Sequence, residues 1–185
     1  MVPLSALWLP ILLSAVIVFV ASSIMHMVLP YHHSDYSQLP DEDKILTALR
    51  SAALKRGLYV FPFCTHKDMK SSAVVEKYKQ GPVGFITILP NGPPAMPKFL
   101  TQWFVYCLLI GFFVAYLTGR TVPPGAQYLA VFRVAGTAAF LAYGLSHLSN
   151  GIWKGQMWVT TIKEVIDGLV YGLLTAGTFG WLWPR

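Results

Sequence analysis

The chain has 185 residues, of which 55% are hydrophobic and only 12% are charged, and its formal net charge is +6. Charged residues are about half as frequent as in soluble domains, which favours an integral membrane protein with a few spans and one small extramembrane unit. The basic excess lies mostly in the middle of the chain. This middle stretch lacks the dense basic clusters and interleaved aromatic residues of nucleic-acid sites, so no nucleic-acid partner is predicted.

Residues 4–29 are almost uninterruptedly apolar and predict a first membrane-spanning helix, because about 20 apolar residues cross the hydrocarbon core. A signal peptide is the competing interpretation, but residues 1–7 lack the basic segment that precedes its apolar core. Further apolar runs predict spans at residues 99–117, 127–148 and 157–183. Four spans would place both termini on one side of the membrane.

The only sizeable polar stretch is residues 30–97, and its turn residues predict a small α/β module. Proline and acidic residues favour helix starts, whereas glycine and Gly-Pro pairs favour helix ends. The pattern predicts, in order, a helix from Pro40 to Gly57, a strand at 58–63, a helix from Ser71 or Ser72 to Gly81, and a strand at 83–89 that pairs with the first.

These elements define the predicted architecture, an integral membrane α-helical protein with four transmembrane helices and a small α/β module between helices 1 and 2. The predicted parts are transmembrane helix 1 at residues 1–29, the module at 30–97, and transmembrane helices 2–4 at 98–185. Cys64 falls in the module and Cys107 in a predicted span, so both are expected to be free thiols.

Small residues recur about every fourth position in the second and fourth predicted spans, a spacing that lets membrane helices approach closely. One bundle has no obvious internal use for both stripes, so the stripes favour contacts with another membrane protein or a second copy. The predicted packing residues are Gly111, Ala115, Gly119, Gly168, Gly172, Ala176 and Gly180.

Ionisable residues inside the predicted spans form a polar stripe, which is costly in hydrocarbon and commonly functional. Glu164, Asp167 and Tyr171 share one face of the fourth span, and Arg133 lies on the third. Counted from the predicted span ends, Arg133 and Asp167 fall at a similar depth, which predicts an ion pair between them. The pair either fixes the helix register or belongs to a proton or ion pathway.

Histidines gather where the first and third predicted spans end, on the side of the 30–97 module. Imidazole and carboxylate groups together bind zinc, iron or copper. The candidate metal ligands are His26, His32, His33, Asp35 and His147. The competing interpretation is that these interfacial histidines bond loop backbone or lipid headgroups, because no HExxH or CxxC spacing is present.

No sequence motif indicates a cofactor or a catalytic residue. Cys64 and His66 are too close in sequence to favour a productive thiol–imidazole pair, and no phosphate-binding loop, nucleophile elbow or haem-attachment motif occurs. The absence of such motifs favours a protein that is not an enzyme, and the sequence does not indicate which cofactor, if any, is bound.

Three passages resemble a set of uncharacterised bacterial inner-membrane proteins of similar length. They are HMVLPYHHSDYSQLPDED after the first span, GPVGFITILPNGP in the module, and DGLVYGLLTAGTFGWLWPR at the C-terminus. The resemblance runs along the whole chain and implies an architecture and a bacterial inner-membrane location. It supplies no catalytic residues, because that family has no assigned activity.

These patterns predict a small structural or accessory subunit of a larger membrane complex, with the lipid bilayer and a membrane protein or a second copy as partners. The first alternative is a transport element for a small solute, an ion or protons that uses the polar stripe. The second is a metal-dependent membrane enzyme. The balance of lysine and arginine predicts that the module faces the cytoplasm.

Overall fold

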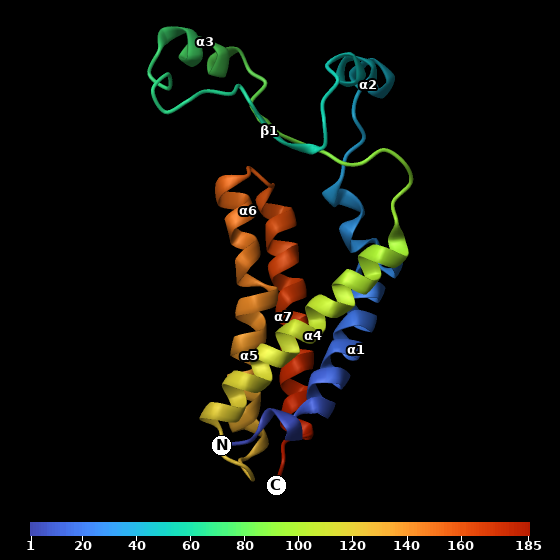
Figure 1. The fold of residues 1–185 in the computed structure, drawn as a ribbon, viewed down its shortest axis with the longest axis vertical. Helices are drawn as coiled ribbons and strands as arrows, with labels where there is room; N and C mark the ends of the chain where they lie inside the picture. The colour runs from blue at the N-terminus through green and yellow to red at the C-terminus, as the bar shows by residue number, and fades with distance from the viewer. The chain divides into compact units, whose positions relative to one another are not determined.

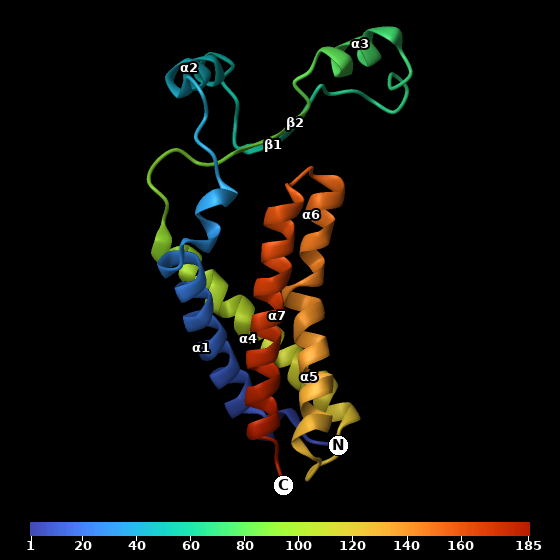
Figure 2. The same ribbon diagram turned by 180° about the vertical axis from the view of Figure 1, so that it is seen from behind.

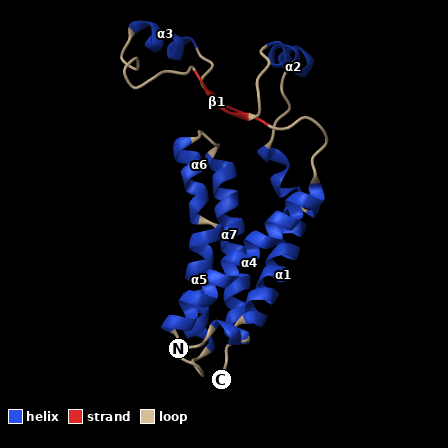
Figure 3. Cartoon of the chain, in the orientation of Figure 1, coloured by secondary structure: helices blue, strands red, loops and turns tan.

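The computed structural model describes all residues from Met1 to Arg185 and divides the chain into two units. The first unit, here the helical bundle, contains Met1–Tyr36, Ala95–Ile152 and Gln156–Arg185. The second, here the small unit, contains Ser37–Pro94 and Trp153–Gly155. The chain is mostly helical, with one small sheet (Figure 3).

Long apolar helices form the bundle, as Figures 1 and 2 show from opposite sides. Three helical runs are long and apolar enough to cross a membrane: Trp8–Val28, Met96–Thr121 and Tyr128–Trp153. The first begins with α1 (Trp8–Ser23), the second is α4 (Met96–Thr121), and the third joins α5 (Tyr128–Tyr143), a 3-10 turn (Leu145–His147) and α6 (Leu148–Trp153).

Helix α7 (Trp158–Trp181) completes the bundle with 24 residues. This helix is long enough to cross a membrane, but Lys163, Glu164 and Asp167 make it less apolar than the other three. Helix α7 packs against α1 and most extensively against α5, while α4 packs against α1 and α5. Helix α7, which carries these charges, therefore contacts the apolar helices α1 and α5.

Both chain ends are fastened to the same end of the bundle (Figure 1). The Val2 amide donates to the Gly119 carbonyl at 2.8 Å, at the C-terminal end of α4. The Gly125 amide, between α4 and α5, donates to the Pro184 carbonyl at 2.9 Å, and the Trp183 indole donates to the Pro123 carbonyl at 2.9 Å. The other end of the bundle carries the polar residues described below.

The predicted small residues of α4 and α7 pack against other helices of the same chain. On α4, Gly111 lies against Ile11 of α1. On α7, Gly168 lies against the backbone of Gly144, and Gly172 lies against Phe140. Both stripes are thus used inside one bundle, and no second protein is needed to explain them. The remaining contacts are Gly119 with Val2, Ala176 with Gly136, and Gly180 with Tyr128, and Ala115 is fully buried.

The small unit contains the two helices and two paired strands that its turn residues predicted. They are α2 (Glu42–Ser51), β1 (Gly57–Phe61), α3 (Ser72–Gln80) and β2 (Gly84–Ile88), with β1 antiparallel to β2 and Tyr59 opposite Ile86. The Ser71 hydroxyl accepts a hydrogen bond from the Val74 amide and caps α3, as predicted.

The predicted end of the first helix of this unit was wrong. Helix α2 stops at Ser51, and Ala53, with φ 49°, takes the left-handed conformation that was expected at Gly57. Gly57 instead begins β1. No residue between Ser37 and Pro94 is buried, so the small unit has no hydrophobic core. Cys64 in this unit and Cys107 in α4 are both free thiols.

Candidate functional site

The candidate site is built by the segment that follows α1. The apolar helix ends at Ser23 and continues as a π-helical turn (Ile24–Val28) that carries His26. Leu29 is extended, and Pro30 then starts a 3-10 turn (Pro30–Asp35) that carries His32. Single π-helical turns are rare and frequently occur at functional sites.

Lys163 of α7 holds the 3-10 turn in place. Its ammonium group donates to the Tyr31 carbonyl at 2.8 Å, to the Ser34 hydroxyl at 2.8 Å and to a carboxylate oxygen of Asp35 at 2.7 Å. All three donors of the ammonium group therefore have acceptors. These bonds join residues near the two ends of the chain, which fixes the His32 turn to α7.

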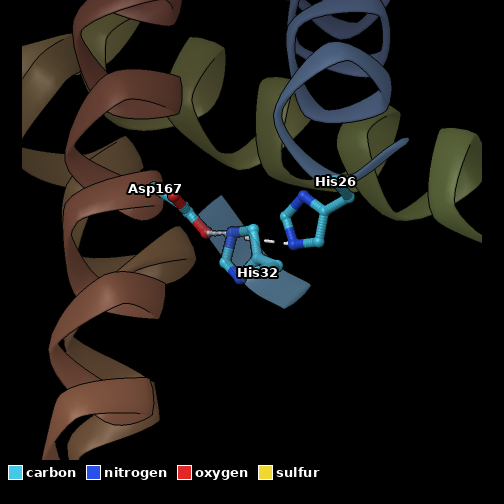
Figure 4. A group of neighbouring side chains, drawn as sticks. All are labelled: His26, His32 and Asp167. Carbon is cyan, nitrogen blue, oxygen red and sulfur yellow. Dashed lines mark ion pairs between the residues drawn. The ribbon is translucent and has the colours of Figure 1, made fainter. Parts of the chain in front are cut away.

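Asp167 lies four residues after Lys163 on α7 and meets both histidines (Figure 4). The Oδ2 atom of Asp167 is 2.9 Å from Nε2 of His32 and 3.9 Å from Nε2 of His26. The two imidazole rings stack with centroids 4.2 Å apart and planes inclined by 13°. Asp167 is 3% exposed, so its carboxylate is nearly removed from bulk solvent.

Hydrogen bonds assign the tautomers of both imidazoles. Nδ1 of His26 lies 3.1 Å from the Ser22 carbonyl, which can only accept, so this nitrogen carries the proton. Nδ1 of His32 lies 2.5 Å from the Asp35 carboxylate and carries the proton in the same way. In both neutral rings Nε2 is then a lone-pair acceptor, and both Nε2 atoms face the Asp167 carboxylate.

With both imidazoles neutral, the arrangement places three electron-pair donors together. Nε2 of His32 and both carboxylate oxygens of Asp167 are buried and have no hydrogen-bond partner, although the nitrogen and Oδ2 are close. Buried polar atoms without partners are costly. A positive charge shared by the three groups, either a metal ion or an additional proton, would remove that cost.

The donor spacing suits a transition-metal ion. Nitrogen and oxygen ligands about 2.0–2.2 Å from a tetrahedral zinc ion lie roughly 3.4 Å apart, and the two measured separations fall on either side of this value. All three ligand atoms lie within 4.8 Å of one another. The distances between the donor atoms therefore suit a metal ion with two imidazole ligands and one carboxylate ligand, and binding would require the stacked rings to turn so that both lone pairs point at the ion.

Asp35 forms a hydrogen bond with Nδ1 of His32, the ring nitrogen that does not face Asp167. Its burial acts to raise the carboxyl pKa, but hydrogen bonds from Lys163 and His32 outweigh burial and hold the pKa of Asp35 below its ordinary value. Asp35 is therefore an anion that orients the ring and increases the basicity of its other nitrogen. Histidine ligands of metal ions commonly have such a carboxylate partner.

A second polar cluster lies beside the first. Glu164 accepts a hydrogen bond from the Gln156 amide at 2.8 Å and is 3.2 Å from Nδ1 of His147. Glu164, His147 and Asp167 line a cavity of about 290 Å³. The rest of its lining is mostly aromatic: Trp103, Tyr106, Tyr143 and Tyr171, with Ser146.

The structure gathers only some of the predicted metal ligands. His26 and His32 come together, and Asp35 stands behind His32. His147 faces Glu164 instead, and His33 is exposed and belongs to neither cluster. Of the predicted polar stripe, Glu164, Asp167 and Tyr171 line the same cavity, and Arg133 does not.

The predicted ion pair between Arg133 and Asp167 is wrong. Arg133 is exposed and has no ion pair, whereas Asp167 faces the histidines. The prediction counted the depth of Arg133 from residue 125 in a core about 30 Å thick, but α5 begins at Tyr128 and its helical run continues to Trp153. Because Gly168 lies beside Gly144 and the two helices are antiparallel, the helix rise places Arg133 about 18 Å from Asp167 along the helix axis.

Sequence reasoning missed Lys163 as a residue of the site, and it gave Asp167 the wrong partner. The partners of both residues lie in the segment that follows α1. Their spacing of four residues, which places them on one face of α7, was the available signal. It could not identify the partner segment, since 128 residues separate Lys163 from Asp35.

No family model, curated protein or solved structure matches this chain. Its resemblance to uncharacterised bacterial inner-membrane proteins stays a prediction.

Proposed function

We propose that the chain is an integral membrane protein with four spans, the fourth being α7. Three apolar helices support the first three spans. The charges of α7 are the obstacle to the fourth, and each has partners inside the bundle: Lys163 has Asp35, Glu164 has Gln156 and His147, and Asp167 has the two histidines. Paired charges that face a bundle interior are the kind that membranes tolerate.

The function proposed for this protein is the binding of a divalent transition-metal ion by His26, His32 and Asp167. One observation carries the proposal: the Nε2 atoms of His32 and His26 lie 2.9 Å and 3.9 Å from the buried carboxylate of Asp167, and the Nδ1 atom of each ring has another partner. Imidazole nitrogen favours zinc, iron, nickel or copper over magnesium and calcium, which prefer oxygen ligands.

Three protein ligands leave at least one coordination position open. Closed structural zinc sites use four protein ligands, whereas catalytic and transfer sites keep a position for water or substrate. A bound ion would also neutralise Asp167 and satisfy the buried atoms that lack partners. The chemistry available is thus Lewis-acid activation of a molecule bound beside the ion, or passage of the ion itself.

Metal analysis of the full-length protein tests this proposal. The protein is purified in mild detergent, incubated with zinc or iron(II), separated from free metal and analysed by inductively coupled plasma mass spectrometry. We expect about one ion per chain, and a near-complete loss in His32→Ala and in Asp167→Asn. His33→Ala is the matched control, because it removes an adjacent imidazole that lies outside the cluster.

Equal metal content in wild-type protein and His32→Ala would refute the site. Equal losses in His33→Ala and His32→Ala would instead indicate non-specific binding to the exposed turn. An intact helical content in each variant, measured by circular dichroism, shows that a loss of metal is not a loss of fold.

A second candidate function is the movement of protons or small cations through the bundle. It is favoured by the cavity that Glu164, Asp167 and Tyr171 line together, since carboxylates inside a bundle mark many such pathways. The test is Glu164→Gln in proteoliposomes. The variant should lose a proton or cation flux that wild-type protein shows, while it keeps its metal content.

The accessory-subunit role stays a prediction, and one of its supports has changed. The small-residue stripes that favoured an external partner contact helices of the same chain. A partner would be detected as additional mass in native mass spectrometry of protein extracted from its own membrane. The bacterial inner membrane, with the small unit on the cytoplasmic side, remains the proposed location.

A further inference from the structure

Arg133 is a charged residue on an apolar surface. It lies on α5 within a run that is long and apolar enough to cross a membrane, and its side chain is exposed. It forms no ion pair and no side-chain hydrogen bond with any residue of the chain. A cation in such a position is costly in hydrocarbon unless something outside the chain pairs with it.

A groove of about 280 Å³ adjoins this arginine, between α5 and α7. Gly136 and Gly172 are among the residues that line it, together with the apolar side chains of Phe132, Phe140 and Leu173. The groove therefore combines a cation with an elongated apolar surface. The two helices lie side by side in Figures 1 and 2.

The position of Arg133 along α5 matches the level of lipid headgroups. The helix begins at Tyr128, so the Cα atom of Arg133 lies about 7 Å from that end, and its long side chain can extend back to the interface. Phe140 lies about 10 Å further into the span. A headgroup at Arg133 and an acyl chain toward Phe140 would follow the groove.

The charge of this end of the bundle favours an anionic occupant. Arg120, at the end of α4, and Arg185 are the other ionisable side chains near it, and residues 95–153 and 168–185 contain no Asp or Glu. The acidic residues of the bundle, Asp35, Glu164 and Asp167, belong to the opposite end. The basic end thus attracts phosphate without competition from carboxylates.

A partner helix fits the groove less well than a lipid. Its two glycines already contact α5 and α7 residues closely: a Cβ atom on Gly136 would lie 3.0 Å from Ala176, and one on Gly172 would lie 3.2 Å from Phe140. They serve the packing of α5 on α7, so they present no free small-residue face for another helix. A flexible acyl chain needs no such face.

We propose that the groove binds one acyl chain of an anionic phospholipid whose phosphate pairs with Arg133. The guanidinium group suits a phosphate because it presents a planar set of donors to two oxygens. The inference goes beyond metal binding, and Arg133 is about 18 Å from Asp167 along the helix axis.

Lipid retention by the full-length protein tests the inference. The protein is reconstituted in vesicles of phosphatidylcholine that contain phosphatidylglycerol with the same acyl chains, extracted in mild detergent and weighed by native mass spectrometry. We expect wild-type protein to retain phosphatidylglycerol in preference to phosphatidylcholine. Arg133→Gln should retain it about fivefold less, whereas Arg133→Lys should keep most of the retention.

Two further variants test whether lipid retention depends on the groove or only on the positive charge of this end of the bundle. Leu173→Trp fills the groove from an exposed position without changing any charge, and it should also lower the retention of phosphatidylglycerol. Arg185→Gln is the matched control, because it removes one positive charge from the same end but lies outside the groove, and it should retain lipid like wild-type protein.

Three outcomes would overturn the inference: unchanged retention in Arg133→Gln, unchanged retention in Leu173→Trp, or an equal loss in Arg185→Gln. Bound mass that corresponds to a second polypeptide in place of lipid would also overturn it. The metal content of Arg133→Gln should equal that of wild-type protein, which shows that the bundle is folded. Lipid retention in His32→Ala should likewise be unchanged, so failure of one proposal is distinguishable from failure of the other.

Discussion

Lys163 and Asp35 illustrate, at the scale of single residues, how a charged helix can be accommodated in an apolar bundle. Their side chains are 13% and 7% exposed, and the ammonium group and carboxylate are 2.7 Å apart. A buried pair contributes little compared with apolar residues of the same shape, but the loss of one partner leaves an uncompensated charge. The pair therefore acts mainly as a constraint on where the His32 turn can lie.

Removal of Lys163 should consequently be costly. We expect Lys163→Met to lower the free energy of unfolding by about 3–5 kcal/mol, because Asp35 would remain buried and charged. The double variant Lys163→Met, Asp35→Asn should lose less than Lys163→Met alone. Unfolding in detergent with increasing denaturant measures these values. Lys154→Met, at an exposed position, is the control and should change stability by less than about 0.5 kcal/mol.

Asp35 also predicts a pH dependence of stability. Despite its burial, hydrogen bonds from Lys163 and His32 hold the pKa of Asp35 below its ordinary value of 3.8. A carboxyl whose pKa is lower in the folded state contributes stability that is fully present above 3.8 and is lost as the pH falls toward the folded-state value. Melting temperatures measured across this range should fall for wild-type protein and fall less steeply for Asp35→Asn.

The same residue should control metal affinity. If Asp35 orients His32, Asp35→Asn should weaken metal binding about 10–100-fold, as other losses of a carboxylate behind a histidine ligand do. The affinity is measured by competition with a chelator of known strength. Identical affinities in Asp35→Asn and wild-type protein would mean that packing alone orients the ring.

At the scale of elements, the contact between α5 and α7 sets the level at which every polar group lies. Gly168 and Gly144 meet backbone to backbone, and this contact fixes the register of the two helices. The register places Asp167 at the level of residue 145 of the neighbouring chain segment, and it leaves Arg133 nearer the other end of the bundle. Small residues thus determine which charged groups can meet.

This contact can be tested with a matched pair of substitutions. Gly168→Ala would place a methyl group against the Gly144 backbone, which cannot move aside easily, and should destabilise the bundle by about 1–3 kcal/mol or more. Gly177→Ala adds the same group on the same helix, where its nearest neighbour is the Tyr128 hydroxyl at an ordinary 3.6 Å. It should be tolerated. Comparable thermal stabilities of the two variants would contradict the role of Gly168.

The elements were more predictable from sequence than their register. Uninterrupted apolar runs marked α1 and α4, and turn residues marked the two strands of the small unit. The end of the third helical run was missed because Ser149 and Asn150 are typical of loops, although both lie in α6. The longer run increases the distance between the two ends from which the depths of Arg133 and Asp167 were counted, so the two residues lie at different levels.

The candidate site was only partly predictable for a related reason. Histidines and carboxylates stood out as chemistry-bearing residues, and His26, His32 and Asp35 were among them. What joins them to Asp167 is a π-helical turn followed by a reversal at Pro30, and neither follows from hydrophobic periodicity. His33, adjacent to His32, could be separated from it only by the backbone geometry of that turn.

At the scale of the whole molecule, the number of membrane spans determines where the chain ends lie. Four spans would place both termini on one side and residues 37–94 on the other, whereas three spans would place the C-terminus on the same side as residues 37–94. The distinction depends on α7, whose charges have partners within the bundle.

Thiol labelling in sealed vesicles distinguishes these arrangements. A reagent that cannot cross the bilayer should modify Cys64 from the side opposite to an epitope placed after Arg185. Cys107, which is fully buried in α4, should react only after denaturation. Modification of Cys64 from the same side as the epitope would show that α7 does not cross.

The bonds from Lys163 to the turn after α1 have a consequence for how the protein is made. Ribosomes synthesise His26 and His32 early and Lys163 and Asp167 late, and 128 residues separate Lys163 from its partner Asp35. The two imidazoles therefore enter the membrane without their carboxylate and without the cation that fixes their turn. If α7 is the fourth span, a nascent chain would acquire all three proposed metal ligands only after that helix has been inserted, and metal uptake would then be a late step of biogenesis.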